Sequence, residues 1–213
     1  MQTFTNSAGA IIVDKLISTI QENKQYLSDI DGLIGDGDHG INMNKGFTMC
    51  REELDKNPGD LSYGLKVLSK ILMLKIGGSM GPLYGKFFKA IALSLDGIDE
   101  IGIATMGNAL KSVVEAIASI SPAKVGDKTL IDTLIPAVAA YSKAQQEGKS
   151  FAEVLEAMKT AARVGRDSTK DMVAKLGRAS RLGERSRGVL DAGATSCCLI
   201  LETFGNSIQE LLN

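Results

Sequence analysis

Apolar residues recur at helical spacing along nearly the whole chain, and this pattern limits the fold more than any other feature of the sequence. Near the N-terminus, Ile12, Leu16 and Ile20 follow one another every four residues, and we expect Asn6 or Ser7 to cap their helix. The same spacing predicts further helices over 41–56, 61–76, 80–95, 101–119, 129–146, 151–173 and 194–212. Long alternations of β-branched residues between turns are missing, so no strand is predicted. The sequence therefore predicts an all-α bundle of about eight helices with short connections.

Size and composition narrow the class of protein. With 213 residues, 44% of them hydrophobic, we expect one domain over residues 1–213. A net charge of −1 and a pI near 5.9 give no reason to expect nucleic acid or an anionic membrane as a partner. Three cysteines without a CxxC pair favour a reducing cytoplasm. The N-terminus lacks the pattern of a signal peptide, and no uncharged apolar run is long enough to span a membrane.

Three familiar loops can be excluded, two of them at the acidic, glycine-rich stretch before the helix at 41–56. "GDGDHG", residues 35–40, matches G-x-G-x-x-G, but its helical surroundings and two aspartates argue against a dinucleotide fingerprint. An EF-hand loop starting at Asp36 fails, because Phe47 stands where a bidentate Glu is needed. "GPLYGK", residues 81–86, is one residue too short for a Walker A loop, and no Ser or Thr follows its Lys.

A magnesium site remains as the functional interpretation. The stretch supplies three carboxylates, those of Asp31, Asp36 and Asp38. Mg²⁺ prefers oxygen ligands and is commonly held by a few carboxylates together with substrate phosphates. The next helix would begin near Ile41 and direct free N–H groups at those phosphates, with hydrogen bonds added by His39 and Asn42. A solvated turn with a helix cap is the structural alternative, since Asp, Gly and Asn are common turn residues.

Two later segments also look like sites. "IGGSMGPLYGKFF", residues 76–88, places Gly78 and Ser79 at an open helix N-terminus, although small residues there would also serve helix packing. "AKLGRASRLGERSRGVLDAG", residues 174–193, is too long and too charged for a simple connection between helices, which favours a functional loop. Its charged residues include Arg178, Arg181, Arg185, Arg187 and Asp191.

Together these motifs resemble, in order and spacing, the nucleotide-binding L subunit (DhaL) of dihydroxyacetone kinases. The resemblance rests on "IGDGDHGINMNKGF", "GGSMGPLYGKFF", "VGDKTLID" and "LGRASRLGERSRGVLDAGATS", and it extends over residues 31–196. It implies a closed barrel of eight antiparallel helices, with ADP or ATP and two Mg²⁺ ions held at one end.

The resemblance also implies which residues form the site. The family's metal-binding pattern D-x4-D-x-D falls on Asp31, Asp36 and Asp38. The implied nucleotide contacts are His39, Gly40, Ile41, Asn42, Gly78, Ser79, Met80, Gly126, Arg178, Asp191, Ala192 and Gly193. Arg178 and Arg185 are the arginines expected to stabilise charge on the transferring phosphoryl group or to clamp the nucleotide.

For activity, the resemblance implies phosphoryl transfer to dihydroxyacetone or a related ketose that a separate K subunit holds on its histidine. His39, the only histidine of this chain, lies in the nucleotide motif and is a poor candidate for that anchor. The chain ends after one L-like unit, so we expect a subunit that docks nucleotide-end first onto a K-type partner. Recharging of bound ADP by a phosphohistidine-carrying M subunit of the phosphotransferase system is favoured over free exchange of ATP. A nucleotide-dependent partner of a transcription regulator and a plain helical scaffold are the non-enzymatic alternatives.

Two departures from the family pattern bear on the substrate. This chain has "GGSMGPL" where the family often has "GGASGPL", so Met80 replaces a small residue. It has "DAGATS" for the usual "DPGATS", so Ala192 restores an N–H and loosens the loop. These changes suggest the hypothesis of a paralogue that acts on a related ketose such as erythrulose.

Overall fold

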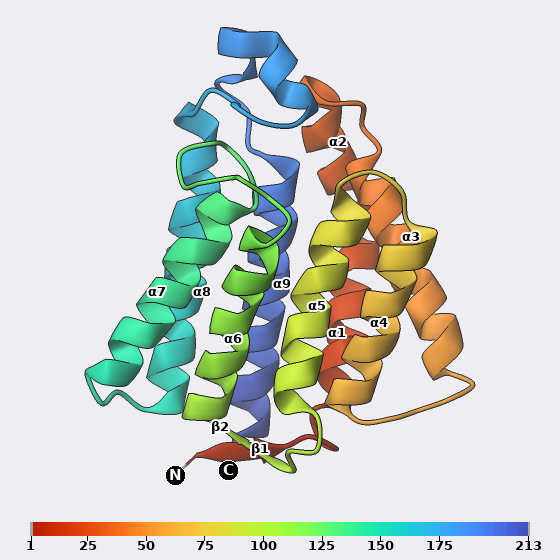
Figure 1. Cartoon of the computed structure of the whole chain (residues 1–213), viewed down its shortest axis with the longest axis vertical. Coiled ribbons are helices and arrows are strands. Elements are labelled where there is room, and N and C mark those ends of the chain that lie inside the picture. The colour runs from red at the N-terminus through yellow and green to blue at the C-terminus, as the bar shows by residue number, and fades with distance from the viewer. Residues whose placement is uncertain (1, 213) are drawn as a thin grey trace.

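The computed structural model describes residues 2–212 and is almost entirely helical (Figure 1). In this range its α-helices are α1 (Ala10–Glu22), α2 (Lys24–Ile34), α3 (His39–Leu54), α4 (Leu61–Lys75), α5 (Met80–Leu95), α6 (Ile103–Ala118), α7 (Ile131–Gln146), α8 (Phe151–Ser168) and α9 (Ala192–Leu211). Two 3₁₀ segments, η1 (Thr169–Asp171) and η2 (Arg178–Ser186), and two strands, β1 (Thr3–Thr5) and β2 (Glu100–Gly102), complete the chain order.

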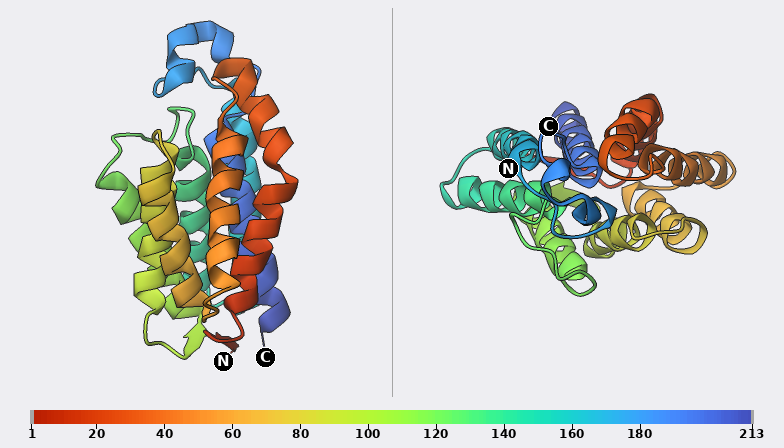
Figure 2. Two further views of the ribbon diagram at one scale, coloured as in Figure 1. Left: turned by 90° about the vertical axis from the view of Figure 1, so that its right-hand side faces the viewer. Right: turned by 90° about the horizontal axis from the view of Figure 1, so that it is seen from above.

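The helices form a ring of neighbours. From α3 to α9 each helix packs against the next, and α1 closes the ring by packing against α9 on one side and against α3 and α4 on the other. Their apolar stripes meet in one continuous core, which includes Phe47, Tyr84, Phe88 and Phe204. The predicted all-α bundle is confirmed (Figure 2).

One helix was missed. α2 follows α1 after only Asn23, and the pair runs in the same direction toward one end of the bundle (Figures 1 and 2). Asp31 therefore lies in the last turn of helix α2 and not in a loop. The Asp and Gly of "SDIDGLIGDG" gave this segment the composition of a loop, but Leu27, Ile30 and Ile34 bury a helical stripe.

The expectation of no strand was wrong. β1 and β2 pair antiparallel in a two-stranded sheet, with Phe4 opposite Ile101 and both side chains buried. Each strand has three residues, which is too short to give a recognisable alternation. The sheet closes the end of the bundle opposite to the segments that resemble a site (Figure 1).

Several predicted boundaries also move. Neither Asn6 nor Ser7 caps α1, which begins after Gly9. The side chain of Asn6 is buried and instead joins three segments, donating to the carbonyls of Leu95 and Ile98 and accepting from the Ser62 N–H, each at 3.0 Å. The helix predicted over 151–173 ends at Ser168, and the one predicted from 101 begins at Ile103, because β2 precedes it.

The connections between helices and strands lie at the two opposite ends of the bundle. At one end lie residues 35–38, 76–79, 119–130 and 169–191, and at the other lie both described chain ends and the sheet (Figure 1). All the site-like segments of the sequence thus meet at one end. Within residues 2–212, no helix is both long and apolar enough to cross a membrane.

Candidate functional site

Three carboxylates converge where α2 passes into α3. Asp31 lies in the last turn of α2, Asp36 in the connection, and Asp38 at the N-cap position of α3. One carboxylate oxygen from each lies within 4.8 Å of the other two. Gly37 turns the chain between them with a φ of +75°, a conformation that side chains rarely adopt. The convergence predicted for these aspartates is therefore present.

The close approach of α2 and α3 depends on a glycine. A Cβ atom at Gly40 would lie 2.0 Å from the carbonyl oxygen of Lys24 and 2.7 Å from Oγ of Ser28. The first turn of α3 consequently lies directly against α2. This contact fixes Asp38 beside Asp31, and the His39 N–H donates to Oδ2 of Asp31 at 3.3 Å.

The donor set fits a hard divalent cation. An octahedral Mg²⁺ with ligands at about 2.1 Å keeps its oxygens between about 3.0 and 4.2 Å apart, and the three carboxylate oxygens lie within 4.8 Å of one another. The N–H groups of Gly40 and Ile41, in the first turn of α3, have no acceptor within the helix and remain available for an anion beside such an ion.

His39 is tied into the bundle rather than free in the site. Its Nε2 lies 2.9 Å from Oγ of Ser196, and that hydroxyl lies 2.6 Å from the Tyr84 hydroxyl. Tyr84 in turn donates to the carbonyl of Gly193 at 3.0 Å. Burial lowers the pKa of His39 to about 4, although the nearby Asp31 acts to raise it. The ring is therefore neutral at physiological pH and serves to position the start of α3 against α9.

The Arg-rich segment, residues 174–193, contacts the acidic turn that carries Asp31, Asp36 and Asp38. Arg178, the first residue of η2, forms an ion pair with Asp36, which is 142 residues away in the chain. Both side chains are largely exposed, so the pair itself adds little stability. Arg181 and Arg185 are exposed and form no ion pair within residues 2–212. The structure thus brings Arg178 to the three aspartates but leaves Arg185 without a protein partner.

The "GDKT" turn, residues 126–129, is fixed by hydrogen bonds to Asp132. The buried carboxylate of Asp132 accepts from the N–H of Gly126 at 2.5 Å and from that of Thr129 at 2.7 Å. Because the Gly126 N–H already has this partner, any contact of Gly126 with a ligand would have to use its Cα or its carbonyl. Lys128, between them, is 1% exposed.

The start of α9 is also occupied by internal contacts. Asp191 caps the helix, accepting from the Ala194 N–H at 2.7 Å. Burial raises the pKa of Asp191 to about 7, while the Ala194 N–H and Lys128 act to lower it. Ala192 is buried, and the Gly193 carbonyl accepts from the Tyr84 hydroxyl. These residues therefore stabilise the start of α9, at the end of the bundle that carries the acidic turn.

The remaining predicted contacts flank the start of α5. Gly78 has a φ of +73° and Ser79 is exposed, whereas the Met80 side chain is buried. Ser79 precedes the helix without a side-chain capping bond, so its hydroxyl is not used by the helix itself. Ile41 and Asn42 lie at the start of α3, exposed and half-buried respectively.

Sequence reasoning missed four residues that organise this end: Tyr84, Lys128, Asp132 and Ser196. Lys128 and Asp132 stand in "VGDKTLID", and the resemblance of this stretch to the family motif was an available signal. Tyr84 and Ser196 had none, because their roles depend on the contact between α5 and α9 near His39.

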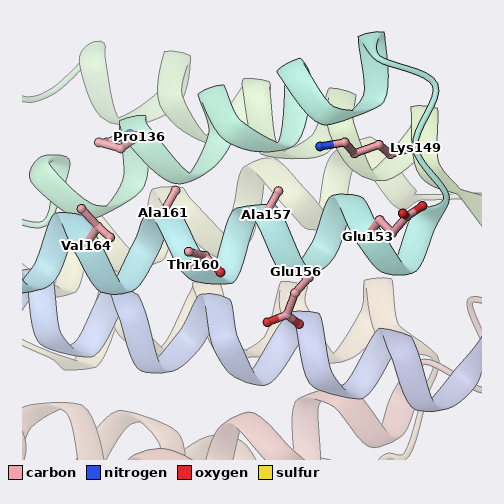
Figure 3. Close-up of a pocket in the computed structure, with 8 residues that line it drawn as sticks. All are labelled: Pro136, Lys149, Glu153, Glu156, Ala157, Thr160, Ala161 and Val164. Atoms are coloured by element: carbon pink, nitrogen blue, oxygen red, sulfur yellow. The ribbon is translucent and has the colours of Figure 1, made fainter.

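A surface groove lies away from these segments. It has a volume of about 700 Å³ and runs between α7 and α8, past Pro136, Ala157 and Ala161 (Figure 3). None of its lining residues belongs to a site-like segment. A smaller groove of about 440 Å³ borders the acidic turn, with Ile30 and Leu33 of α2 facing Val189 and Leu190.

Comparison with known proteins now identifies the family. The DAK2 domain matches residues 33–206 of this chain. The chain belongs to the DAK2 domain family. It is 32% identical, over 93% of both chains, to the ADP-binding subunit DhaL of PEP-dependent dihydroxyacetone kinase 2 from Listeria innocua. It is 34% identical to the ADP-binding subunit DhaL of the PEP-dependent kinase from Escherichia coli, over 87% of this chain and 89% of that one.

A third relative and a solved structure agree with these DAK2 matches. The PTS-dependent dihydroxyacetone kinase subunit DhaL of Lactococcus lactis is 37% identical, over 89% of this chain and 91% of that one. The dihydroxyacetone kinase of C. freundii, solved with AMP-PNP and Mg²⁺, superposes with a TM-score of 0.67 at 23% identity and covers 97% of this chain. This DAK2 chain spans 35% of that kinase, and the likeness concerns the fold. The resemblance to DhaL subunits found in the motifs is confirmed.

Proposed function

We propose that this chain is the nucleotide-binding subunit of a ketose kinase, which passes a phosphoryl group to dihydroxyacetone or a related short ketose held by a separate K-type subunit. The observation that carries the proposal is the meeting of Asp31, Asp36 and Asp38 with Arg178 at one end of the bundle. Relatives named as ADP-binding subunits of dihydroxyacetone kinases support it, as does the C. freundii kinase solved with AMP-PNP and Mg²⁺.

The carboxylates would hold Mg²⁺, two ions by analogy with the family, and bound Mg²⁺ supplies neutralisation of phosphate charge. The N–H groups of Gly40 and Ile41, together with the Ser79 hydroxyl, would bind phosphate oxygens. Arg178 would pair with the transferring group, because its guanidinium already lies against Asp36. His39, neutral and bonded to Ser196, would hold the α3 N-terminus in place and not act as a phosphoryl carrier.

The same end of the bundle carries exposed apolar side chains that suit docking of a K-type partner. Leu33 is 67% exposed, Leu74 68% and Val125 53%, and they lie on three different connections or helix ends around the acidic turn. Exposed apolar groups around a charged site are typical of an interaction surface. A partner seated there would also exclude water from the phosphoryl group.

Recharging of bound ADP by a phosphohistidine donor is favoured over exchange of ATP. The relatives with PEP- or PTS-dependent names match along nearly their whole length, at 89% to 93% of each chain. The D-erythrulose kinase of Mycolicibacterium smegmatis is matched over only 36% of its chain, at 30% identity. Dihydroxyacetone is the first substrate to assay, and Met80 and Ala192 keep erythrulose as a substrate to be assayed beside it.

The test is to purify the protein without added nucleotide, quench it in acid, and measure released nucleotide and magnesium on the same sample. We expect near-stoichiometric ADP with magnesium. An empty protein that Mg-ATP stabilises against heat would argue for exchange of ATP instead. No bound nucleotide and no stabilisation by Mg-ATP or Mg-ADP would contradict the proposal.

A further inference from the structure

Lys128 is a buried charge whose place in the fold the proposed chemistry does not explain. Its side chain is 1% exposed, and its backbone has a φ of +62°, a strained value for a residue other than glycine. Burying an ammonium group without partners is strongly unfavourable, so the charge of this lysine must be compensated locally. Its surroundings provide that compensation.

The ammonium group is held by three main-chain carbonyls. Nζ donates to Ser186 and Val189 at 2.6 Å each and to Met172 at 3.2 Å, which uses all three of its donors. Met172 lies just before the Arg-rich segment, and Ser186 and Val189 lie at its end. One side chain therefore joins the two ends of the segment 172–189 and closes it into a loop.

Other hydrogen bonds join the same two arms, residues 169–174 and 186–191, whose junction we call the neck. The Ala174 N–H donates to Oγ of Ser186 at 2.9 Å, the Gly188 N–H to the Lys170 carbonyl at 2.7 Å and the Asp191 N–H to Oγ1 of Thr169 at 3.0 Å. The Arg187 guanidinium also donates to the Asp171 carbonyl. Lys128 adds to these bonds a single group that bonds to both arms at once. Beyond the neck, η2 lies over the end of the bundle, mostly exposed, and touches α2 near the acidic turn (Figure 1). Its 3₁₀ turns are interrupted at Gly183 and bury only Ser186, so η2 has little packing of its own to hold it there.

The backbone around Lys128 is itself fixed by Asp132. Asp132 accepts from Gly126 and Thr129 on either side of Lys128, and Asp132 belongs to the first turn of α7. The chain of contacts thus runs from α7, through the "GDKT" turn, to the neck of the loop, and from there to Arg178 at Asp36.

We propose that Lys128 is a positioning residue, whose buried ammonium closes the neck of the segment 172–189 and thereby holds Arg178 over the acidic turn. Its effect on nucleotide binding rests on the proposed function. The closure of the loop does not, because all its contacts are made within the chain.

The test compares three proteins by hydrogen exchange and mass spectrometry without nucleotide: wild type, Lys128→Gly and Lys159→Met. Glycine adopts the φ of +62° without strain, so Lys128→Gly removes the side chain and leaves the backbone conformation available. Lys159 is the matched control. It is also buried, at 4% exposed, but its Nζ is held between α8 and α9 by the side-chain oxygens of Asn206 and Gln209, and by an ion pair with Glu156.

We expect exchange in peptides from 172–190 to rise at least about tenfold in Lys128→Gly and to stay at the wild-type rate in Lys159→Met. n-Butylammonium, which replaces the missing side chain, should slow this exchange again, whereas tetramethylammonium, which has no N–H donor, should not. Wild-type exchange over 172–190 in Lys128→Gly, or a rise spread evenly over the whole chain, would overturn the proposal. So would equal effects of the two cations.

A second measurement separates this proposal from the proposed function. Lys128→Gly should weaken Mg-ADP affinity about tenfold, with partial rescue by n-butylammonium, whereas Lys159→Met should leave it unchanged. An unchanged affinity in Lys128→Gly would overturn the link to the site. If the wild-type protein binds no Mg-ADP, the proposed function fails, and the exchange result still decides whether Lys128 closes the loop.

Discussion

At the scale of single residues, Asp36 differs from the other two aspartates because it also pairs with Arg178. Replacing Asp36 by Asn keeps the shape of the side chain but removes one of three negative charges. We expect Mg-ADP affinity to fall by about 100-fold or more, or about 2.8 kcal/mol, as measured by calorimetry. Asp55→Asn, at the opposite end of α3, is the control with the same change of charge and should bind as wild type. If Asp36→Asn bound Mg-ADP with the wild-type affinity, the acidic turn would be a solvated helix cap and not a metal site.

Arg178 is expected to act on transfer more than on binding. The side chain is mostly exposed and lies at the acidic turn, so its charge is available to a phosphoryl group. In the enzyme reconstituted with a K-type subunit, Arg178→Met should lower the transfer rate by at least about 100-fold, with a smaller change in nucleotide affinity. Arg181→Met, three residues along the same 3₁₀ segment, should change neither. Equal activity of the two variants would remove Arg178 from the mechanism.

Asp191 should make stability depend on pH. Its pKa is raised to about 7 in the folded protein from an ordinary value of 3.8, so between these values the folded chain binds a proton that the unfolded chain lacks. The contribution of this group to stability is therefore fully present below about pH 4, falls as the pH rises to about 7, and is constant above. Asp191→Asn keeps a cap oxygen but cannot titrate. Its melting temperature relative to wild type, in EDTA, should rise between pH 4 and 7, and a flat difference would contradict the assignment.

At the scale of elements, the site depends on how closely α2 and α3 pack. Gly40→Ala would place a Cβ atom 2.0 Å from the carbonyl oxygen of Lys24, a backbone atom that cannot rotate away. We expect a loss of about 2–4 kcal/mol in the free energy of unfolding, measured by urea denaturation, and weaker binding of Mg²⁺ as Asp38 moves away from Asp31. Gly77→Ala is the control for stability, because a Cβ atom there meets nothing within 4 Å. If Gly40→Ala and Gly77→Ala had the same free energy of unfolding, close packing of α2 on α3 would not contribute to stability.

At the scale of the whole molecule, the two ends of the bundle differ, and the proposed ligand site lies at only one of them. The β1–β2 sheet closes the first end, while exposed loops form the second. Mg-ADP at 100 times its Kd should add about 2.7 kcal/mol of stability, or roughly 5–10 °C in Tm. Hydrogen exchange should slow over residues 28–42 and 172–190 and stay unchanged over β1 and β2. Protection of the sheet end instead would place the ligand elsewhere, and addition of EDTA should reverse the stabilisation.

The sequence by itself determined the helical class, most of the helices and the acidic turn. These features follow from local rules: apolar spacing sets which residues form helices, and the Asp and Gly content of 31–40 requires a turn rich in carboxylates. The motifs also identified the family, which the comparisons confirm. The failures are instructive in the same terms. α2 has a loop-like composition, and only its burial against α3 and α9 makes it a helix.

The tertiary structure alone decided which distant residues meet. The ion pair between Arg178 and Asp36, the hydrogen bonds from His39 through Ser196 to Tyr84, and the Lys128 ammonium among three carbonyls each join segments far apart in the chain. A residue's side chain carries no local sign of such a partner, because the partner is chosen by the packing of whole helices. For the same reason the role of Lys128, which the sequence offers only as part of the stretch "VGDKTLID", is set by the folded bundle.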